Sequence, residues 1–258
     1  MFKSLWHDSK LMGLLASFLT LFAIALFTTV VGRWFIQLPY FAIKKFEIVG
    51  EVERLNMDSF KTAVLPKVQG SFFSINLEAT KGLVEDQAWV RKAVVQRVWP
   101  NGLKVSVQSH KPLALWGDTR LLNTFGEVFA ANPAEAGEPD SMAVLHGPPG
   151  SEFLVAKTYV TWIKDFAEIG MVPASVKLSD RYGWTVKTKE GLAVELGRDQ
   201  EPLSLQAKIN RLKWVYPKLR NEVMKTVEVI DMRYAKAFAV KGERMTAPRK
   251  VNIELKTN

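Results

Sequence analysis

The longest apolar run in the chain covers residues 11–32, LMGLLASFLTLFAIALFTTVVG, and contains no charged residue. Lys10 and Arg33 bracket it. A helix needs about 20 apolar residues to cross the hydrocarbon core of a bilayer, where no water can satisfy open backbone groups. A buried core helix would normally carry a polar face, and a cleaved signal peptide would have a shorter apolar region and a small-residue cleavage site. The run therefore predicts an uncleaved transmembrane helix over residues 11–36.

Aromatic and basic residues around this run bear on its topology. Trp6 and Trp34 would lie about 42 Å apart along a helix, close to the full thickness of a bilayer, which is typical of an aromatic belt. Lys and Arg occur on both sides of the run, so their count does not settle the orientation. Because the long domain follows the anchor, we expect residues 1–10 to form a short cytoplasmic head and the carboxyl side to face the periplasm.

The segment after the anchor changes from a strand-like to a helix-like pattern and back. Residues 43–49, IKKFEIV, are typical of a strand and end at a glycine. Helical segments are expected at about 57–65 and 77–87. Two β-branched runs, about 90–99 and 103–109, flank a Pro-Asn-Gly sequence that favours a hairpin, because Asn and Gly tolerate positive φ. The predicted order is strand, helix, helix, strand, strand.

From Pro112 onward, short apolar segments alternate with turn sequences rich in Gly, Pro and Asn. Apolar positions recur at helical spacing over residues 153–169, and again from Leu205 to Leu219. Short strands are expected at about 176–178, 184–187, 192–196 and 226–232. The predicted fold class is α+β: a single transmembrane helix, a β-α-α-β-β domain, and a larger, mostly antiparallel β domain with two helices.

The charge of the chain limits its partners only modestly. It has 35 Lys and Arg against 26 Asp and Glu, a net charge of +9, and no cysteine, which excludes disulfides and thiolate metal sites. A basic domain suits anionic lipid, here that of the inner membrane, or acidic partners. Nucleic acid is the rival interpretation, but an extracytoplasmic location would exclude it, so no nucleic-acid partner is expected. The last predicted helix carries much of this charge, and we expect its basic side to be a solvated face opposite a buried stripe. Its basic residues are Lys208, Arg211, Lys213, Lys218 and Arg220.

The sequence contains little sign of catalytic chemistry. His7 lies before the anchor, and His110 and His146 have no second ligand at metal-binding spacing, so solvated loop histidines are expected. Glu85 and Asp86 lie at a predicted helix end, where solvation is the ordinary explanation for paired carboxylates. Neither G-x-S-x-G nor H-E-x-x-H occurs. We therefore predict no enzymatic activity, no catalytic or metal-binding residue, and no cofactor or small-molecule substrate.

An ordered set of motifs runs from the predicted hairpin towards the end of the chain. The pattern W-V-x-x-A-x-V-x-R-x-W-P is formed by Trp89, Val90, Ala93, Val95, Arg97, Trp99 and Pro100. Further positions of the set are Pro112, Ala114, Trp116, Gly126, Trp184, Gly197, Asp231, Arg233 and Tyr234. The set resembles the bacterial cell-division family FtsQ, called DivIB in Gram-positive relatives, and its β-α-α-β-β segment resembles a POTRA domain.

This resemblance implies a POTRA domain at residues 41–110 and a β domain at residues 111–258 whose last strands bind a partner. FtsQ-like proteins are single-pass proteins of the cell inner membrane, concentrated at the division septum. They link early and late divisome proteins to septal peptidoglycan synthesis without doing chemistry themselves. Their implied partners are the bitopic proteins FtsB and FtsL and an FtsK-like recruitment protein. The mode of contact proposed for the family is addition of a partner strand to the last strand of the β domain.

The same resemblance implies the site residues. The partner-binding edge is expected at Tyr234, Ala237, Phe238, Ala239 and Val240. A proline at Ala239 is expected to block the added ladder while leaving the fold intact. Arg97 is a candidate for docking another division protein through the POTRA domain. The structural motif comprises Trp89, Trp99, Pro100, Trp116, Trp184, Asp231 and Arg233. Of these, Trp89, Trp99 and Trp116 are expected in the core. Asp231 and Arg233 are expected to hold the strand that precedes the partner-binding edge.

The chain departs from the family pattern in two places. Ser109 stands where relatives often have Glu, and no Trp follows Val240. A tail continues instead to VNIEL at residues 251–255, whose alternation is compatible with one more strand. Two rival functions remain open: an anchored POTRA protein that handles unfolded or outer-membrane polypeptides, and an anchored cell-wall enzyme.

Overall fold

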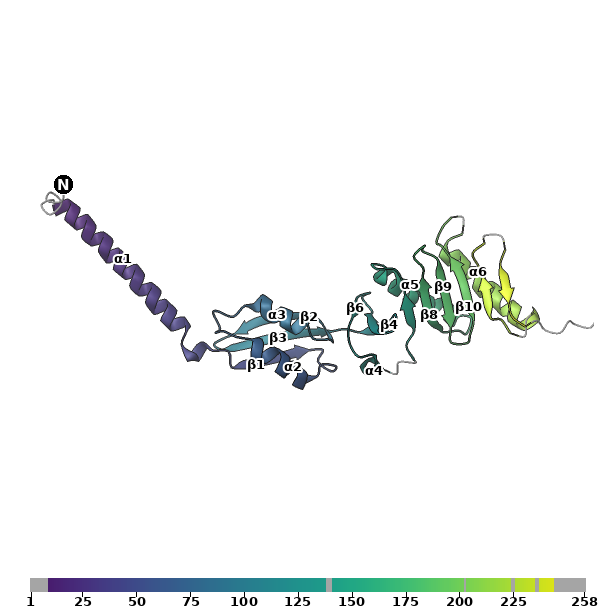
Figure 1. The fold of residues 1–258 in the computed structure, drawn as a ribbon, viewed down its shortest axis with the longest axis horizontal. Coiled ribbons are helices and arrows are strands. Elements are labelled where there is room, and N and C mark those ends of the chain that lie inside the picture. The colour runs from purple at the N-terminus through teal and green to yellow at the C-terminus, as the bar shows by residue number, and fades with distance from the viewer. Residues whose placement is uncertain (1–8, 138–140, 202, 224–225, 235–236, 244–258) are drawn as a thin grey trace, which may run out of the picture. The chain divides into compact units, whose positions relative to one another are not determined.

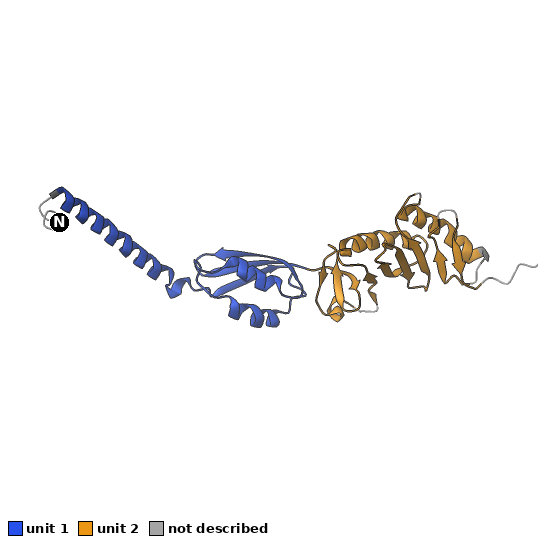
Figure 2. Ribbon diagram, turned by 45° about the horizontal axis from the view of Figure 1, so that its top comes forward, with its two compact units in different colours: residues 1–109 blue, residues 110–258 orange. Residues whose placement is uncertain are grey.

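The chain divides into two compact units, residues 1–109 and 110–258 (Figure 2). The computed structural model describes residues 9–137, 141–201, 203–223, 226–234 and 237–243. Each unit has its own hydrophobic core.

The first element is α1, Ser9–Ile36, a helix of 28 residues (Figure 1). Its most apolar window has a mean hydropathy of 2.4, and no part of that window is buried inside the protein. The hydroxyls of Thr20, Thr28 and Thr29 donate to backbone carbonyls one turn earlier, at 2.7, 2.9 and 2.8 Å. The helix therefore satisfies its own polar groups, as hydrocarbon surroundings require. By length and composition, α1 is able to cross a membrane.

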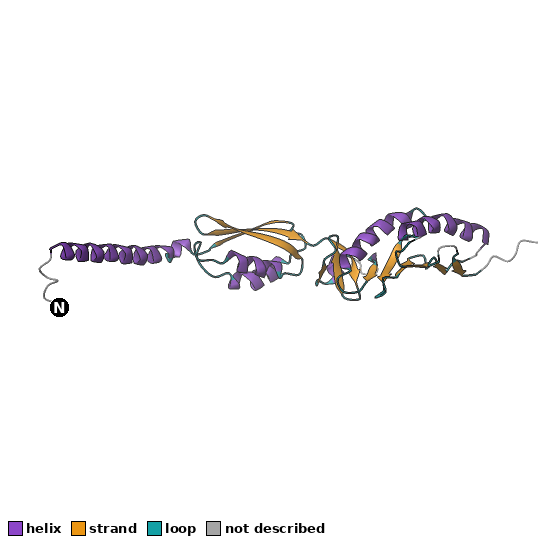
Figure 3. Cartoon of the chain, turned by 90° about the horizontal axis from the view of Figure 1, so that it is seen from above, coloured by secondary structure: helices purple, strands orange, loops and turns teal. Residues whose placement is uncertain are grey.

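The rest of the first unit is a three-stranded sheet with two helices packed on it (Figure 3). Strand β3 lies in the middle, parallel to β1 and antiparallel to β2. In chain order the elements are η2 Pro39–Phe41, β1 Lys45–Gly50, α2 Met57–Val64, η3 Leu65–Lys67, α3 Leu77–Glu85, β2 Val90–Val98 and β3 Gly102–Ser109. This confirms the predicted order of strand, helix, helix, strand, strand.

Both helices of this unit begin at an asparagine that caps them. The side chain of Asn56 accepts from the N–H groups of Asp58 and Ser59, and that of Asn76 accepts from Ala79 N–H. Such caps satisfy donors that have no partner within the helix. The helices then bury one apolar face each against the sheet. The buried cluster comprises Leu55, Phe60, Val64, Val84, Val90, Ala93, Val105 and Val107.

The second unit is built on a nine-stranded sheet in the order β12-β11-β10-β9-β8-β7-β4-β5-β6. Its strands are β4 Pro112–Trp116, β5 Arg120–Asn123, β6 Val128–Phe129, β7 Val144–His146, β8 Pro173–Leu178, β9 Trp184–Thr188, β10 Ala193–Gly197, β11 Val229–Asp231 and β12 Ala239–Lys241. The pairs β4–β7, β7–β8 and β10–β11 are parallel and the other five are antiparallel, so the sheet is mostly antiparallel as predicted.

Two long helices, α5 Glu152–Ala167 and α6 Leu205–Lys218, lie along one face of this sheet (Figure 3). A short helix, α4 Pro133–Ala136, and a π-helical turn, η5 Leu219–Val223, complete the unit. In the middle of the sheet, Val176, Val186 and Val194 lie side by side in register and are fully buried. From α5, Trp162 packs edge-on against Trp184 at 5.2 Å between ring centroids. The long helices thus close the core over the central strands.

Two details differ from the expectations. The strand predicted at residues 226–232 is shorter in the structure, where β11 covers only Val229–Asp231. Trp99 is not a core residue, because 62% of its surface is exposed at the end of β2, whereas Trp89 and Trp116 are buried as expected. The strand considered at residues 251–255 lies outside the described residues.

Alanine substitutions at Gly50 and Gly82, both in the first unit, are expected to change its stability in opposite directions. Gly50 has a φ of +110°, and a Cβ there would lie 2.2 Å from the Val107 carbonyl oxygen. We expect Gly50→Ala to lower the free energy of unfolding by more than about 2 kcal/mol, through backbone strain and the clash. A Cβ on Gly82, inside α3, would meet nothing within 4 Å. Gly82→Ala should therefore raise stability by about 0.5–1 kcal/mol.

Calorimetry of the full chain in detergent measures both variants under the same conditions. An unfolding temperature for Gly50→Ala equal to or above that of Gly82→Ala would show that the close approach of β1 and β3 does not constrain this position.

Candidate partner-binding edge

Strand β12 forms one end of the nine-stranded sheet. It pairs with β11 on one side, and within the described part of the chain no strand pairs with its other side. An edge strand presents a row of open main-chain donors and acceptors, which is a template for pairing with another segment. The residues expected to bind a partner lie in and just before this strand.

The direction of the main-chain groups in β11 can be derived from its bonds to β10. The carbonyl of Glu228 accepts from Ala193 N–H at 2.8 Å, and Met232 N–H donates to the Glu195 carbonyl at 2.8 Å. Main-chain groups of successive strand residues alternate between the two sides. Even-numbered positions of β11 therefore face β10, and its odd-numbered positions face β12.

This alternation decides which groups of β12 are open. The register pairs Val229 with Lys241, Ile230 with Val240 and Asp231 with Ala239. Because positions 229 and 231 face β12, their partners Lys241 and Ala239 direct their main-chain groups inward to β11. Val240, between them, directs its N–H and carbonyl to the open edge. By this derivation the N–H of Ala239 points to the ladder inside the fold, and Val240, rather than Ala239, is the proposed outward donor.

The side chains around this edge have different surroundings. Phe238 packs against the core of the unit, and the Arg211 guanidinium lies 5.3 Å from its ring centroid. Val240 is half-buried, while Ala237 and Ala239 are exposed. Tyr234 is 61% exposed, and its carbonyl accepts from Arg211 Nη1 at 3.2 Å. The segment thus offers an exposed aromatic ring and open main-chain groups on a supported strand.

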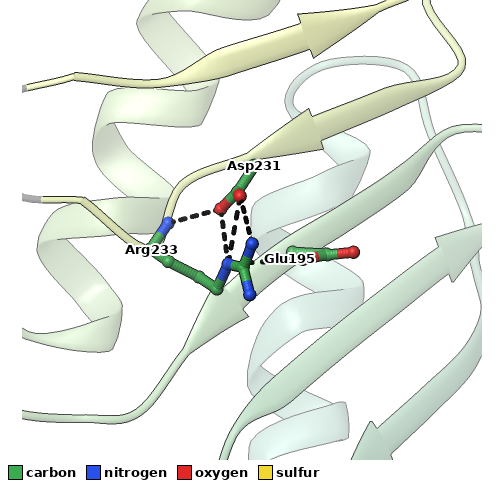
Figure 4. A network of polar contacts seen from close by, with 3 residues as sticks. All are labelled: Glu195, Asp231 and Arg233. Atoms are coloured by element: carbon green, nitrogen blue, oxygen red, sulfur yellow. Dashed lines mark hydrogen bonds and ion pairs between the residues drawn. The ribbon is translucent and has the colours of Figure 1, made fainter.

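An ion-pair network holds the chain where it leaves β11 (Figure 4). Arg233 Nη2 donates to Asp231 Oδ2 at 2.6 Å, and Arg233 Nε lies 2.9 Å from Asp231 Oδ1 and 3.3 Å from Glu195 Oε2. Since Asp231 and Glu195 are register partners on neighbouring strands, the guanidinium offsets their repulsion. The hydrogen bonds from Arg233 lower the pKa of Asp231, and the same carboxylate raises the pKa of Arg233. This network fixes the turn that leads into the edge.

Helix α6 supports the same end of the sheet through cations that were expected to be solvated. Lys208 is 2% exposed, and its Nζ donates to the Arg198 carbonyl at 2.6 Å; burial lowers its pKa. Lys213 Nζ lies 2.9 Å from Asp165 Oδ1 and joins α6 to α5. Arg211 holds the segment after β11, as described above. The prediction of a solvated basic face is wrong at these three positions, because sequence spacing did not indicate what faces them.

Three other residues singled out in the sequence make hydrogen bonds within the first unit. The exposed Arg97 donates from Nη2 to the Ile75 carbonyl at 2.8 Å. Glu85 is not simply solvated, since its carboxylate accepts from Ala93 N–H at 2.9 Å and ties α3 to β2. Ser109 bonds through its hydroxyl to the Glu51 carbonyl.

The two histidines beyond the anchor are also not solvated loop residues. His110 stacks on Phe129 at 4.1 Å between ring centroids, and its Nδ1 lies 2.8 Å from Asn123 Nδ2. His146 is half-buried on β7 and lines a small cavity of about 210 Å³. Among the described residues, no three His, Cys, Asp or Glu side chains come together as metal ligands would.

Taken together, the fold and the edge define a protein with an apolar amino-terminal helix, a POTRA-type domain and a sheet domain in which no described strand pairs with the outer side of β12. Two family matches agree with this class: residues 41–110 match the POTRA domain, FtsQ-type, and residues 114–233 match cell division protein FtsQ/DivIB, C-terminal. The second match ends before β12.

Curated relatives lead to the same family. The chain is 35% identical over 242 residues to the cell division protein FtsQ of Burkholderia pseudomallei, covering 93% of this chain and 96% of the relative. It is 31% identical to FtsQ of Bordetella pertussis (92% of each chain) and 32% identical to FtsQ of Nitrosospira multiformis (93% and 100%). The chain belongs to the FtsQ family of cell division proteins.

The Asp231–Arg233 pair predicts a pH-dependent contribution to stability. A carboxyl with a lowered pKa in the folded state stabilises the fold above its unfolded pKa of about 3.9, and this contribution is lost as the pH falls through the lower folded value. We expect Asp231→Asn to lower the free energy of unfolding by about 1 kcal/mol at pH 7. The effect is small because the Arg233 side chain is 52% exposed, so water screens its interaction with Asp231.

Urea unfolding at pH 7 and at pH 3 measures this difference, which should shrink at the lower pH. Glu228→Gln is the control, since the exposed Glu228 carboxylate lies 3.9 Å from Lys241 Nζ and the substitution keeps the main-chain hydrogen bonds of the residue. If Asp231→Asn behaved like this control at pH 7, the pair would not hold the turn after β11.

Proposed function

We propose that this protein is a non-enzymatic scaffold of the divisome, anchored in the cell inner membrane by α1. Its carboxyl-terminal units face the periplasm and it concentrates at the division septum, where it links early and late division proteins to septal peptidoglycan synthesis. Membership of the FtsQ family supports the role in division. The length and apolar composition of α1 support the single crossing.

The proposed partner contact is strand addition at β12. The observation that carries this proposal is the open edge, at which Val240 directs both main-chain groups away from β11. A partner segment that pairs there would gain affinity from these groups and selectivity from alternate side chains. Tyr234 and Phe238 are the proposed side-chain anchors, because aromatic residues supply much of the binding energy at interfaces.

Family membership supports the proposal of FtsB-like and FtsL-like bitopic proteins as the partners at this edge. An FtsK-like recruitment protein is a further proposed partner. Separately, a surface for docking another division protein is proposed on the POTRA-type domain, with Arg97 as the candidate residue. Its guanidinium is held by the Ile75 carbonyl, and its side chain is exposed. Exposed charges of this kind affect partner choice and association rate more than affinity.

The proposed orientation predicts the behaviour of topology reporters. Alkaline phosphatase fused after Asn258 should be active, because it folds only after export, and a reporter that works only in the cytoplasm should be inactive there. Western blots of both fusions control for expression. The reverse pattern would place the sheet domain in the cytoplasm and refute the proposed scaffold.

The open edge predicts different effects of proline at neighbouring positions. Val240→Pro removes the outward N–H, so we expect it to weaken binding of the FtsB homologue's periplasmic part by about tenfold or more, near 1.4 kcal/mol, with little change in unfolding temperature. Ala239→Pro removes an inward donor and should lower the unfolding temperature instead. Calorimetric titration and thermal unfolding of the full chain in detergent measure the two effects.

Val240→Thr is the matched control, because it keeps the backbone N–H and a β-branched side chain of similar size. It should bind nearly as tightly as the natural chain. Unchanged affinity of a folded Val240→Pro variant would place the partner surface elsewhere, and equal losses for Thr and Pro would assign the contact to the Val240 side chain rather than to strand addition.

A further inference from the structure

Five aromatic rings gather at the end of the first unit where the chain enters it. Phe41 lies at their centre, 5.0 Å from Phe73 and 5.5 Å from Trp99 between ring centroids, and 5.2 Å from Tyr40. Phe72 joins Trp99 at 5.2 Å. We call these five residues the aromatic cluster. They come from η2, from the turn before α3 and from the β2–β3 hairpin, so the fold assembles the aromatic cluster from three separate segments.

The outer rings of this cluster are open to the surroundings. Phe41 is 3% exposed, whereas Trp99, Tyr40 and Phe73 are 62%, 60% and 41% exposed. Burying large aromatic side chains is favourable, and a contiguous exposed patch of such rings marks an interaction surface. Trp and Tyr are the residues that prefer the boundary between lipid and water.

The path of the chain sets how far this cluster lies from the membrane that α1 is proposed to cross. The apolar run 11–32 rises about 33 Å, which matches the hydrocarbon core of about 30 Å. The helix then ends at Ile36, about 6 Å further, within the headgroup layer. Phe41 follows five residues later and its ring lies 5.1 Å from Phe35, the penultimate residue of α1. Because Phe41 contacts a residue of α1 that this count places in the headgroup layer, the aromatic cluster begins at the level of that layer.

Positive charge borders the cluster on the same end of the sheet. Lys44 and Lys45 are exposed, and both backbone N–H groups donate to the carbonyl of Asn101, at 2.9 and 3.3 Å. Asn101 lies in the hairpin turn, two residues after Trp99. Lysines next to a membrane surface are attracted by anionic lipid headgroups.

We propose that the aromatic cluster is a second membrane contact, in which Trp99, Tyr40 and Phe73 lie in the headgroup layer and Lys44 and Lys45 meet lipid phosphates. This proposal rests on the proposed membrane crossing by α1. The contact adds a second attachment to that made by α1, so the POTRA-type domain keeps this end on the membrane surface.

Spin labels on single cysteines test the contact in the full chain, reconstituted in lipid nanodiscs containing phosphatidylglycerol. The natural sequence has no cysteine, so no background residue needs removal. Labels at Ser17→Cys in α1, Phe73→Cys in the aromatic cluster and Ala88→Cys at the opposite end of the sheet are compared by their collision rates with oxygen and with an aqueous nickel chelate. We expect the collision rates to place the label at 17 deep in the bilayer, the label at 73 at the lipid–water interface and the label at 88 in water.

A variant removes the contact while the labels stay in place. Trp99→Ser with Tyr40→Ser should shift the label at 73 to the aqueous value of the label at 88, with the label at 17 unchanged. Trp214→Ser is the matched control, since Trp214 is 65% exposed on α6 and should leave the label at 73 interfacial. Unfolding temperatures show that the serine variants remain folded. In nanodiscs of phosphatidylcholine alone, the label at 73 should lie closer to the water, because Lys44 and Lys45 then lose their attraction to anionic lipid.

Other results would overturn the proposal. An aqueous signal at 73 with a deep signal at 17 would show that α1 crosses the membrane while the aromatic cluster stays in water. Spin–spin broadening at 73 would identify a second copy of the chain as the occupant of the surface. An aqueous signal at 17 would refute the membrane crossing, and the proposed contact would fall with it.

Discussion

Main-chain hydrogen bonding is the constraint on which the second unit depends. Nine strands satisfy one another's backbone groups in sequence, but an open sheet has to end, and its last strand keeps one row of donors and acceptors unpaired within the described chain. Here that strand is β12, only three residues long. A short edge limits unwanted pairing, and Val240 at its centre is the residue whose main-chain groups point outward. The proposed partner contact uses a feature that the sheet cannot avoid having.

An edge can bind a partner strand only if it keeps its own position without that partner. Side chains of the sheet and of α6, the two structures that flank the edge segment, provide this support. Arg233 binds Asp231 and Glu195 on the sheet side, and Arg211 of α6 binds the Tyr234 carbonyl on the helix side. The buried Lys208 and the Lys213–Asp165 pair secure α6 itself. Lys208, Arg211 and Lys213 of α6 therefore act as internal supports of the edge, which explains how a helix with these cations packs on a core.

The first unit meets a different constraint at its amino-terminal end. A helix in hydrocarbon must satisfy every backbone group internally, and α1 does so, including the hydroxyls of Thr20, Thr28 and Thr29. Immediately after it, the aromatic cluster presents rings that are costly to expose to water. Both features fit the environment proposed for this end of the unit, a bilayer and its interface. The same unit then uses capped helices and a buried cluster of aliphatic residues, as a water-soluble domain does.

Local patterns in the sequence were enough to predict the anchor, the order of elements in the POTRA-type domain and the α+β class, because each depends on apolar periodicity and on turn residues such as Asn-Gly and Pro. The motif from Trp89 to Pro100 indicated the family for the same reason: it is contiguous. Tertiary structure alone decided which residues meet. It exposed Trp99 beside Phe41, buried Lys208, and turned the N–H of Ala239 inward and that of Val240 outward. These outcomes depend on strand register and on contacts between segments far apart in the chain, and neither is recorded in the spacing of residues along it.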